Sequence, residues 1–289
     1  MTTLRRPPNR VVRLNRLGDA DRDDLEALVD SDPLVNCVIA SRLATILSLM
    51  VARFGGAVLG IRDGDLLRAA VFSGGNLLPI GGADRDWEQL ANHLAGLRRV
   101  CTSIVGRADA VAAMWRVLAP AWGSPRAVRA SQTLLAISRP GPSVAADPRV
   151  RPIRACEIEQ YLPAATAMFT EELGVSPLMT VSPAAYRRRV AGLIDTGRAF
   201  GIVDRDGSVI FKADIGAISR HSCQVQGVWV RSDLRGRGLG TAALGCVVGH
   251  ALTLAPTVSL YVNDYNVTAR RMYERLGMHP VATLSTVLF

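Results

Sequence analysis

The second half of the chain alternates between apolar runs of strand length and amphipathic segments of helical length. The runs are rich in Val, Ile and Leu, whereas the longer segments carry apolar residues at helical spacing. Ser182 before Pro183 is typical of a helix start, and the sequence Arg-Asp-Gly at 205–207 is typical of a hairpin turn. The pattern predicts the order βααβββαβαβ. Strands are expected at 150–154, 199–204, 209–215, 222–230, 258–262 and 281–289, and helices at 157–172, 183–196, 239–254 and 267–276.

The first half follows the same order of elements, although its residues do not repeat those of the second half. Strands are expected at 11–14, 57–61, 66–72, 77–80, 101–105 and 131–137, and helices at 21–30, 35–50, 86–97 and 108–118. Between the halves, residues 139–148 are rich in Pro, Gly and Ser, which is typical of a linker. We therefore expect an α/β protein with mixed (α+β) sheets and two tandem domains, 1–140 and 150–289.

A loop with the sequence Arg-Gly-Arg-Gly-Leu-Gly, residues 235–240, lies between a predicted strand and a predicted helix. The first amides of a helix have no acceptors within the helix, and the helix dipole adds partial positive charge there. Glycine lets the backbone approach an anion closely, and arginine adds charge and hydrogen-bond donors. The loop indicates a pyrophosphate site, although a Gly-rich turn with incidental arginines gives the same pattern.

Composition narrows the class of partner. The chain has 289 residues and is 49% hydrophobic, which suffices for two domains with buried cores. The net charge is +9, but the arginines are scattered and no basic stretch is interleaved with aromatic residues, which argues against a nucleic-acid partner. An acidic ligand such as a nucleotide is the simpler explanation of the charge.

Neither a metal nor a membrane partner is expected. The 5 cysteines are far apart, and with the 4 histidines they complete no metal-ligand spacing. They are typical of reduced thiols in a cytoplasmic protein. Residues 1–8 lack the apolar core of a signal peptide, and the apolar runs are interrupted before the roughly 18 residues that a membrane span needs. We therefore predict a cytoplasmic location.

Two segments of the second half resemble the GNAT N-acetyltransferase superfamily. Residues 226–240 resemble the acyl-CoA-binding segment with its Arg/Gln-x-x-Gly-x-Gly/Ala loop, and residues 263–277 resemble the second signature of the family. The signatures are filled here by Arg235, Gly238 and Gly240, and by Asn266, Ala269, Tyr273 and Gly277. The first half resembles the degenerate N-terminal domain of some actinobacterial acetyltransferases. The resemblance thus implies two tandem GNAT-like folds, the N-terminal one degenerate.

The resemblance also implies a co-substrate, acetyl-CoA, and a set of site residues without a metal. In the family, the strand before the loop splays from its neighbour and pairs with the pantetheine arm, and the loop binds the pyrophosphate. The implied cofactor-binding residues are Val228, Trp229, Val230, Arg235, Gly236, Arg237, Gly238, Leu239, Gly240, Thr241, Asn266 and Tyr273. The backbone amide of Val228 or its neighbour would polarise the thioester carbonyl, and Tyr273 would protonate the leaving thiolate as the catalytic acid. Simpler interpretations stay open: core strand residues for Val228 and Val230, a helix cap for Asn266 and a packing residue for Tyr273.

The general base departs from the family pattern. Gln226 occupies the position where many members carry a glutamate, and an amide does not accept a proton at neutral pH. Glu171 and Glu172 end the segment that usually forms the acceptor wall. They hold a cationic amine, serve as a remote base, or are solvated charges at a helix end. The predicted reaction is acetyl transfer from acetyl-CoA to a primary amine by direct attack; the alternative is a non-catalytic acyl-CoA-binding regulatory protein.

The acceptor and the assembly state stay open. The expected acceptor is a small-molecule or peptide amine, and a homodimer is compatible with the sequence. In the first half, the counterpart of the loop is Gly-Gly-Ala-Asp at 81–84, which lacks the arginines. Asp84 and Asp86 would compete with a phosphate at that helix start. We therefore expect no pyrophosphate in the first domain.

Overall fold

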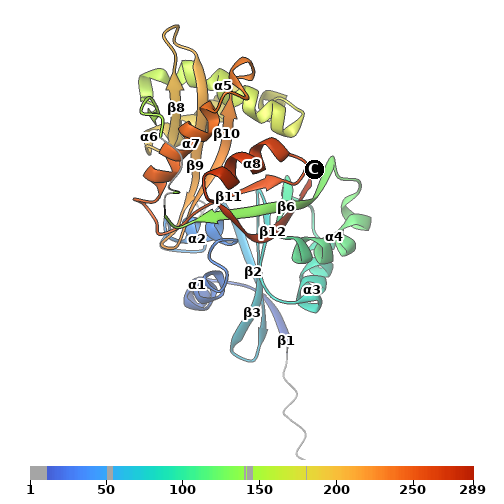
Figure 1. Cartoon of the computed structure of the whole chain (residues 1–289). Coiled ribbons are helices and arrows are strands. Elements are labelled where there is room, and N and C mark those ends of the chain that lie inside the picture. The colour runs from blue at the N-terminus through green and yellow to red at the C-terminus, as the bar shows by residue number, and fades with distance from the viewer. Residues whose placement is uncertain (1–11, 51–54, 140, 142–145, 180) are drawn as a thin grey trace, which may run out of the picture. The chain divides into compact units, whose positions relative to one another are not determined.

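A computed structural model describes residues 12–50, 55–139, 141, 146–179 and 181–289 (Figure 1). Two parts of the sequence analysis fall outside the described residues. They are the segment 1–8, which was predicted not to be a signal peptide, and residues 140 and 142–145 of the predicted linker. The described residues pack as two compact units. Unit 1 contains the residues up to Gln132 together with Thr283–Phe289, and unit 2 contains Thr133–Ala282.

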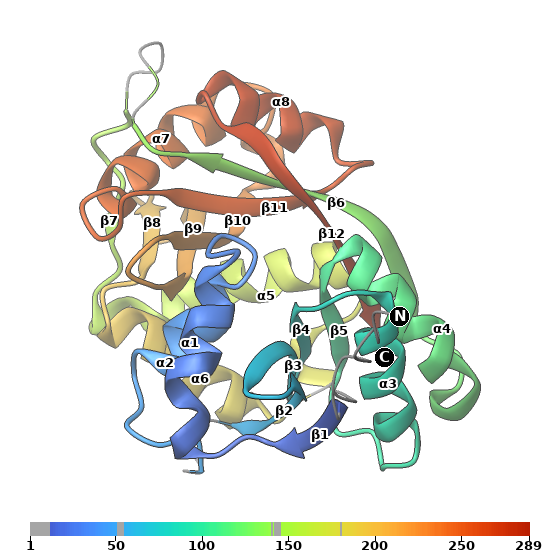
Figure 2. The same cartoon turned by 90° about the horizontal axis from the view of Figure 1, so that it is seen from below.

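Unit 1 is a mixed sheet with helices on both faces (Figure 2). Its strands are neighbours in the order β1-β2-β3-β4-β5-β12-β6. β4 and β5 run parallel, whereas β1 with β2, β2 with β3, β3 with β4 and β5 with β12 are antiparallel. The strands are β1 (Val12–Arg16), β2 (Gly56–Asp63), β3 (Leu66–Gly74), β4 (Leu77–Gly81), β5 (Ser103–Arg107) and parts of β6 (Ala127–Ile137) and β12 (His279–Leu288). The second part of β6, from Thr133 on, and the first part of β12, up to Ala282, belong to unit 2. The helices are α1 (Arg22–Asp30), α2 (Cys37–Leu43), α3 (Asp84–Ala95) and α4 (Ala108–Trp122).

Strand β3 explains how unit 1 forms a core on each face of its sheet. Successive side chains of a strand point to opposite faces. Ala70 and Phe72 pack with the buried residues of α1 and α2, whereas Ala69 and Val71 pack with those of α3 and α4. A continuous apolar run in the sequence therefore corresponds to a strand that is buried on both sides.

The helix predicted at 35–50 is wrong in its length. The structure has only α2 (Cys37–Leu43), followed by turns, and Leu47 is 99% exposed. Thr45 donates from its hydroxyl to the Arg42 carbonyl, and Asp19 accepts a hydrogen bond from the Leu49 amide. These side-chain contacts replace backbone bonds of a helix, which is the usual way in which Ser, Thr and Asp end one.

Unit 2 repeats the layout, and its strands are neighbours in the order β6-β11-β10-β9-β8-β7. Strands β7 to β10 are antiparallel to one another, and β10 is parallel to β11. The strands are β7 (Arg151–Pro152), β8 (Ala199–Val203), β9 (Val209–Ile218), β10 (Cys223–Val230) and β11 (Val258–Asn263). The helices are α5 (Ile158–Leu173), α6 (Pro183–Asp195), α7 (Leu239–Ala251) and α8 (Val267–Arg275).

The predicted order βααβββαβαβ is confirmed in both halves of the described chain. Ser182 caps α6 as predicted, because its hydroxyl accepts a hydrogen bond from the Ala185 amide at 3.3 Å. The predicted α/β class is therefore confirmed. The assignment of roles to domains 1–140 and 150–289 stays a prediction, because packing alone gives neither unit a role.

Among the residues that the structure describes, no helix is both long enough and apolar enough to cross a membrane.

Glu157 provides a test of how unit 2 is stabilised. Its side chain is 7% exposed and accepts hydrogen bonds from the guanidinium groups of Arg151 and Arg154, all at 2.7 Å. These groups, Arg151 first, hold the pKa of the Glu157 carboxyl well below its usual range. We expect Glu157→Gln to lower the free energy of unfolding by about 2 kcal/mol at pH 7, because charge-assisted hydrogen bonds are lost.

The difference between Glu157→Gln and the wild type should shrink as the pH falls. A carboxyl whose pKa is lowered in the folded state stabilises above its unfolded pKa and loses this contribution as it is protonated. Urea unfolding at several pH values below and above 4 measures the effect. Glu159→Gln is the control, since Glu159 pairs with Arg187 on the surface. Equal effects of the two variants at neutral pH would contradict the prediction.

Candidate functional site

Strands β10 and β11 diverge soon after the first residues at which they pair. Cys223 pairs with Val258 and Gln224 pairs with Ser259, and no later residue of β10 is in register with β11 within the described chain. On its other side, β10 stays paired with β9 as far as Val230. The edge of β10 that faces away from β9 is thus left with backbone groups that another extended molecule can bind.

A bulge interrupts the pairing of β10 with β9 at the same level. Gln226 lies opposite Asp214 and Trp229 lies opposite Lys212, so that two residues, Gly227 and Val228, face the single residue between them on β9. Gly227 has a φ of +59°, a backbone conformation that favours glycine. The bulge changes the direction in which the following peptide groups of β10 point.

The Gly-rich loop joins the end of β10 to the start of α7. Gly236 and Gly238 have φ values of +75° and +82°, and Gly238 is the N-cap residue of α7. A Cβ on Gly240 would lie 3.0 Å from Sδ of Met272 and 3.1 Å from Cγ2 of Val230. The first turn of α7 therefore packs closely on β10 and α8, and its positive end faces the exposed loop.

Glu171 connects the end of α5 to this loop. Its carboxylate accepts a hydrogen bond from Nε1 of Trp229 at 3.0 Å and from Nη2 of Arg235 at 2.7 Å. Nε of Arg235 also donates to the carbonyl of Val230 at 2.8 Å. The structure thus brings together the predicted residues of α5, β10 and the loop, and Glu171 is already paired with a cation of the protein. Arg237, Leu239 and Thr241 complete the loop and the first turn of α7, and Arg237 is exposed.

Tyr273 and Asn266 come from α8. Tyr273 is buried, and burial raises the pKa of its phenol, with a further contribution from the negative charge of Glu172. Tyr273 is therefore protonated at neutral pH, and its hydroxyl has no hydrogen-bond partner in the part of the chain that the structure describes. The Asn266 side chain accepts a hydrogen bond from the Ala269 amide at 3.1 Å, which makes Asn266 the cap of α8.

Gln226 lies on the solvent-exposed part of β10, one residue before the bulge. A Cβ on Gly216 would lie 2.4 Å from Cδ of Gln226, so the amide side chain lies directly over the backbone of β9. The position holds a neutral amide where a carboxylate would act as a base.

A buried cluster of charged residues lies behind the bulge and was missed by the sequence analysis. Nζ of Lys212 donates to Oδ2 of Asp214 at 2.7 Å and to the carbonyl of Gly227 at 3.0 Å. The hydroxyl of Tyr161 donates to Oδ1 of Asp214 at 2.6 Å. Burial and the neighbouring carboxylate raise the pKa of Tyr161 well above its usual range. A lysine and an aspartate two positions apart within an apolar strand were the available signal.

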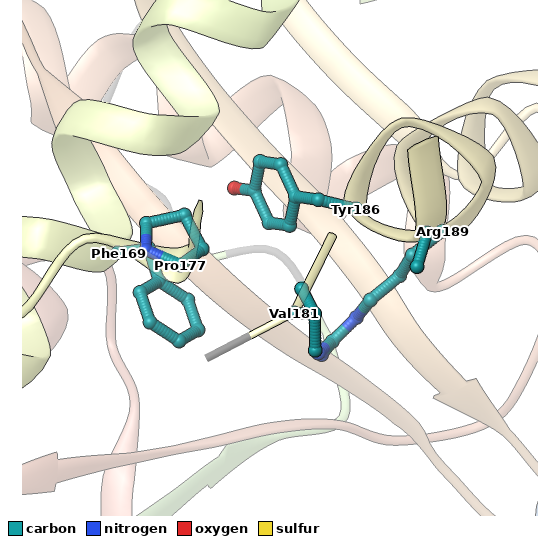
Figure 3. A pocket seen from close by; sticks show the side chains of 6 residues that line it. Phe169, Pro177, Val181, Tyr186 and Arg189 are labelled. Atoms are coloured by element: carbon teal, nitrogen blue, oxygen red, sulfur yellow. The ribbon is translucent and has the colours of Figure 1, made fainter. Parts of the chain in front are cut away.

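A small cavity of about 100 Å³ lies between α5 and α6 (Figure 3). It is lined by Phe169, Pro177, Val181, Ala185, Tyr186 and Arg189, which come from α5, the 3-10 turn at Pro177–Met179, the segment after it and α6. Burial raises the pKa of the Tyr186 phenol. The lining is apolar apart from one guanidinium and one phenol, which suits an apolar group with a polar end.

In unit 1, the N-terminus of α3 corresponds to that of α7 in unit 2, and a side chain of the protein binds an amide group at this terminus. Oδ2 of Asp86 accepts a hydrogen bond from the Ala83 amide at 3.1 Å and from Nη2 of Arg68 at 3.0 Å. A Cβ on Gly106 of β5 would lie 2.7 Å from Pro79 of β4, so the side chain of Pro79 fills the space between these strands. No cluster of His, Cys, Asp or Glu suited to a metal ion occurs among the described residues of either unit.

Comparison with known families agrees with this geometry. Residues 158–278 match the Acetyltransferase (GNAT) family, and residues 56–161 match a Domain of unknown function (DUF4081). A search of curated protein sequences finds no significant match.

Three solved structures are similar over nearly their whole length. A GNAT-family acetyltransferase from Colwellia psychrerythraea has 11% identity and a TM-score of 0.57, covering 96% of this chain and 99% of that chain. A tandem GNAT protein from the clavulanic acid biosynthesis pathway has 15% identity and a TM-score of 0.56, with coverages of 96% and 98%. A GCN5-related N-acetyltransferase from Sphaerobacter thermophilus has 17% identity and a TM-score of 0.56, with coverages of 97% and 96%. At these identities the likeness is one of fold.

Residues 158–278 therefore form an acyltransferase domain of the GNAT type. These residues belong to the GNAT family of acetyltransferases, and the chain as a whole has the fold of a tandem GNAT protein.

Lys212 offers a direct test of the buried cluster. It is the single lysine of the chain, and its side chain is 0% exposed. Among the amines of the native protein, we expect dinitrofluorobenzene to modify the N-terminal amine and to reach Lys212 only after unfolding in urea. Peptide mass spectrometry measures both sites, and the N-terminal amine is the internal control. Rapid modification of Lys212 in the folded protein would contradict the buried ion pair.

Proposed function

We propose that unit 2 transfers an acetyl group from acetyl-CoA to a primary amine by direct attack of the amine on the thioester. The observation that carries this proposal is the parting of β10 from β11 directly before a Gly-rich helix start. An extended chain can pair with the free edge of β10 while its phosphates lie at the positive end of α7. Few ligands other than an acyl-CoA combine these two parts.

The binding residues follow from this arrangement. The backbone of Val228, Trp229 and Val230 would pair with the pantetheine arm, and the amides of the first turn of α7 would bind the pyrophosphate together with Arg235 and Arg237. Gly236, Gly238 and Gly240 keep the backbone close to the phosphates because they carry no Cβ. Asn266 caps α8 with its carbonyl oxygen, which leaves its amide nitrogen as a donor for the pantetheine.

The chemistry needs a polarised carbonyl, a neutral amine and a proton for the thiolate. The amide of Val228 would donate to the thioester oxygen while the amine nitrogen forms the new bond to the carbonyl carbon. The C–S bond then breaks as Tyr273 protonates the departing sulfur. The attacking nitrogen, which is positively charged after it bonds to carbon, gives its extra proton to solvent, and solvent protonates the Tyr273 phenolate again. Burial raises the pKa of the Tyr273 phenol, so the proton that it would donate is present at neutral pH.

The attacking amine must lose a proton without help from Gln226. Glu171 is engaged by Arg235 and Trp229, and Glu172 lies close enough to Tyr273 to influence its pKa. We propose that the amine loses its proton to solvent. An acceptor with a low pKa would therefore react fastest.

Calorimetry with acetyl-CoA, followed by mass spectrometry of a panel of amines and peptides, tests the proposal. Acetylated products support it. Absence of binding at millimolar acetyl-CoA would overturn it, and binding without any product would favour a non-catalytic acyl-CoA-binding protein.

Two variants separate the two contacts of Arg235. Arg235→Ala removes a phosphate donor and should weaken acetyl-CoA binding about tenfold, because a charge-assisted hydrogen bond is lost. Glu171→Gln breaks the same ion pair but leaves the guanidinium in place, so its binding should not weaken. Calorimetry at constant ionic strength measures both affinities. Equal losses in the two variants would mean that Arg235 acts only by tying α5 to the loop.

Tyr273→Phe keeps the ring but removes the proton donor. We expect kcat to fall by roughly a hundredfold with little change in acetyl-CoA affinity. Since the pKa of Tyr273 is raised, the wild type should lose no activity through its ionisation up to about pH 10. Steady-state rates against pH measure this, with Tyr265→Phe as the exposed control. An unchanged rate would remove Tyr273 from the mechanism.

A further inference from the structure

The buried cluster of Lys212, Asp214 and Tyr161 meets β10 at one atom, the carbonyl oxygen of Gly227. Nζ of Lys212 donates to this oxygen at 3.0 Å. The ammonium is held by Oδ2 of Asp214 at 2.7 Å, and Tyr161 holds the other carboxylate oxygen at 2.6 Å. Lys212 also lies over the ring of Tyr161, 5.4 Å from its centroid. The ammonium is therefore fixed in place by groups from β9 and α5.

Gly227 is fitted to this contact. A Cβ at this position would lie 2.9 Å from Nζ of Lys212 and 3.2 Å from Oδ2 of Asp214, and the φ of +59° is itself unfavourable for other residues. Only glycine allows both the bulge and the close approach of the ammonium. The bulge and the buried charge therefore form one structural unit.

Peptide geometry extends this contact to the next amide. The carbonyl of Gly227 and the N–H of Val228 belong to the same peptide group, which is planar and, as the chain has no cis bonds among its described residues, trans. In a trans peptide the C=O and N–H bonds point in opposite directions. Because the carbonyl is directed to Lys212 of β9, the Val228 N–H is directed away from Lys212. The edge of β10 that has no partner in β11 lies on the side of β10 opposite β9.

The ammonium also makes that N–H a better donor. A hydrogen bond to the carbonyl of a peptide group withdraws electron density from it, and linked hydrogen bonds strengthen one another in a site shielded from water. A positive charge on the far side of the peptide adds to this effect. The Lys212 side chain is 0% exposed, so its effect on a ligand at this edge would be transmitted through the peptide group.

Stability alone does not account for a cluster of this kind. A buried ion pair contributes little more to folding than well-packed apolar side chains of the same volume, because both charges lose their hydration. The specific contribution of the cluster is one charged donor aimed at one carbonyl.

We propose that Lys212 is a positioning residue for acyl transfer: through the Gly227 carbonyl it orients and polarises the Val228 amide that binds the thioester oxygen. This inference rests on the proposed function, since it concerns the same site. Asp214 and Tyr161 act through Lys212 by holding its ammonium in place.

Infrared spectroscopy of bound acetyl-CoA, labelled with ¹³C at the acetyl carbonyl, tests the proposal without an acceptor. In the wild type, the carbonyl stretch of the bound thioester should lie below that of the free molecule, because the Val228 amide polarises it. In Lys212→Met, most of this shift should be lost while the affinity for acetyl-CoA, which depends on the loop at α7, stays unchanged.

A second variant covers the case in which Lys212→Met does not fold, since it leaves Asp214 buried without its cation. The triple variant Lys212→Met, Asp214→Val, Tyr161→Phe replaces the whole cluster by apolar side chains. It should fold and bind acetyl-CoA but lack the carbonyl shift. Arg68→Met is the matched control, because it breaks the buried pair with Asp86 in unit 1 and should keep the shift.

The outcomes are distinct. A full carbonyl shift in the triple variant would overturn the role of Lys212, since an apolar cluster would then serve as well. Loss of the shift in Arg68→Met to the same degree would also overturn it, because general destabilisation would be the cause. Failure of the wild type to bind acetyl-CoA would instead overturn the proposed function, and the inference with it.

Discussion

The parting of β10 from β11 is the constraint on which the rest of unit 2 depends. Two parallel strands that stay paired leave no backbone group for a ligand, whereas here pairing ends after Gln224. Every other feature of the site is arranged around this opening. The bulge at Gly227 changes the direction of the peptide groups that follow it in β10. Helix α7 begins after the loop that follows β10. Helix α8 carries Tyr273, which packs in the same core as Val228 and Leu239.

The sequence predicted the order of elements and the Gly-rich loop because both are local. Strand and helix periods, a Ser-Pro helix start and a run of glycines and arginines are visible within a few residues. The buried cluster joins Tyr161 of α5 to a carboxylate 53 positions later, and no local pattern encodes such a contact. The pairing of Thr283–Phe289 with unit 1, through β5, is likewise a long-range choice between equivalent edges. The short α2 was missed because Thr45 and Asp19 bind the backbone there.

The two units share one topology but differ at the helix start that follows the fourth strand. In unit 2 this start carries glycines, exposed arginines and no acidic residue in its first turn. In unit 1 the carboxylate of Asp86 lies where an anion would bind at the helix start. The side chain of Pro79 fills the space between β4 and β5. A few side chains thus decide whether the same helix start is open to solvent or closed by the protein itself. What those side chains do is not readable from the fold itself.

The scarcity of lysine has a consequence for a protein that handles a reactive thioester. Of 34 basic residues only Lys212 is a lysine, and it is enclosed by Asp214, Tyr161 and the bulge. Guanidinium groups stay charged and are poor nucleophiles, whereas a neutral lysine amine reacts with acyl donors. The surface of this protein therefore offers no lysine for the donor to acylate. An acyltransferase composed in this way keeps its own charge pattern intact, however long it holds its activated substrate.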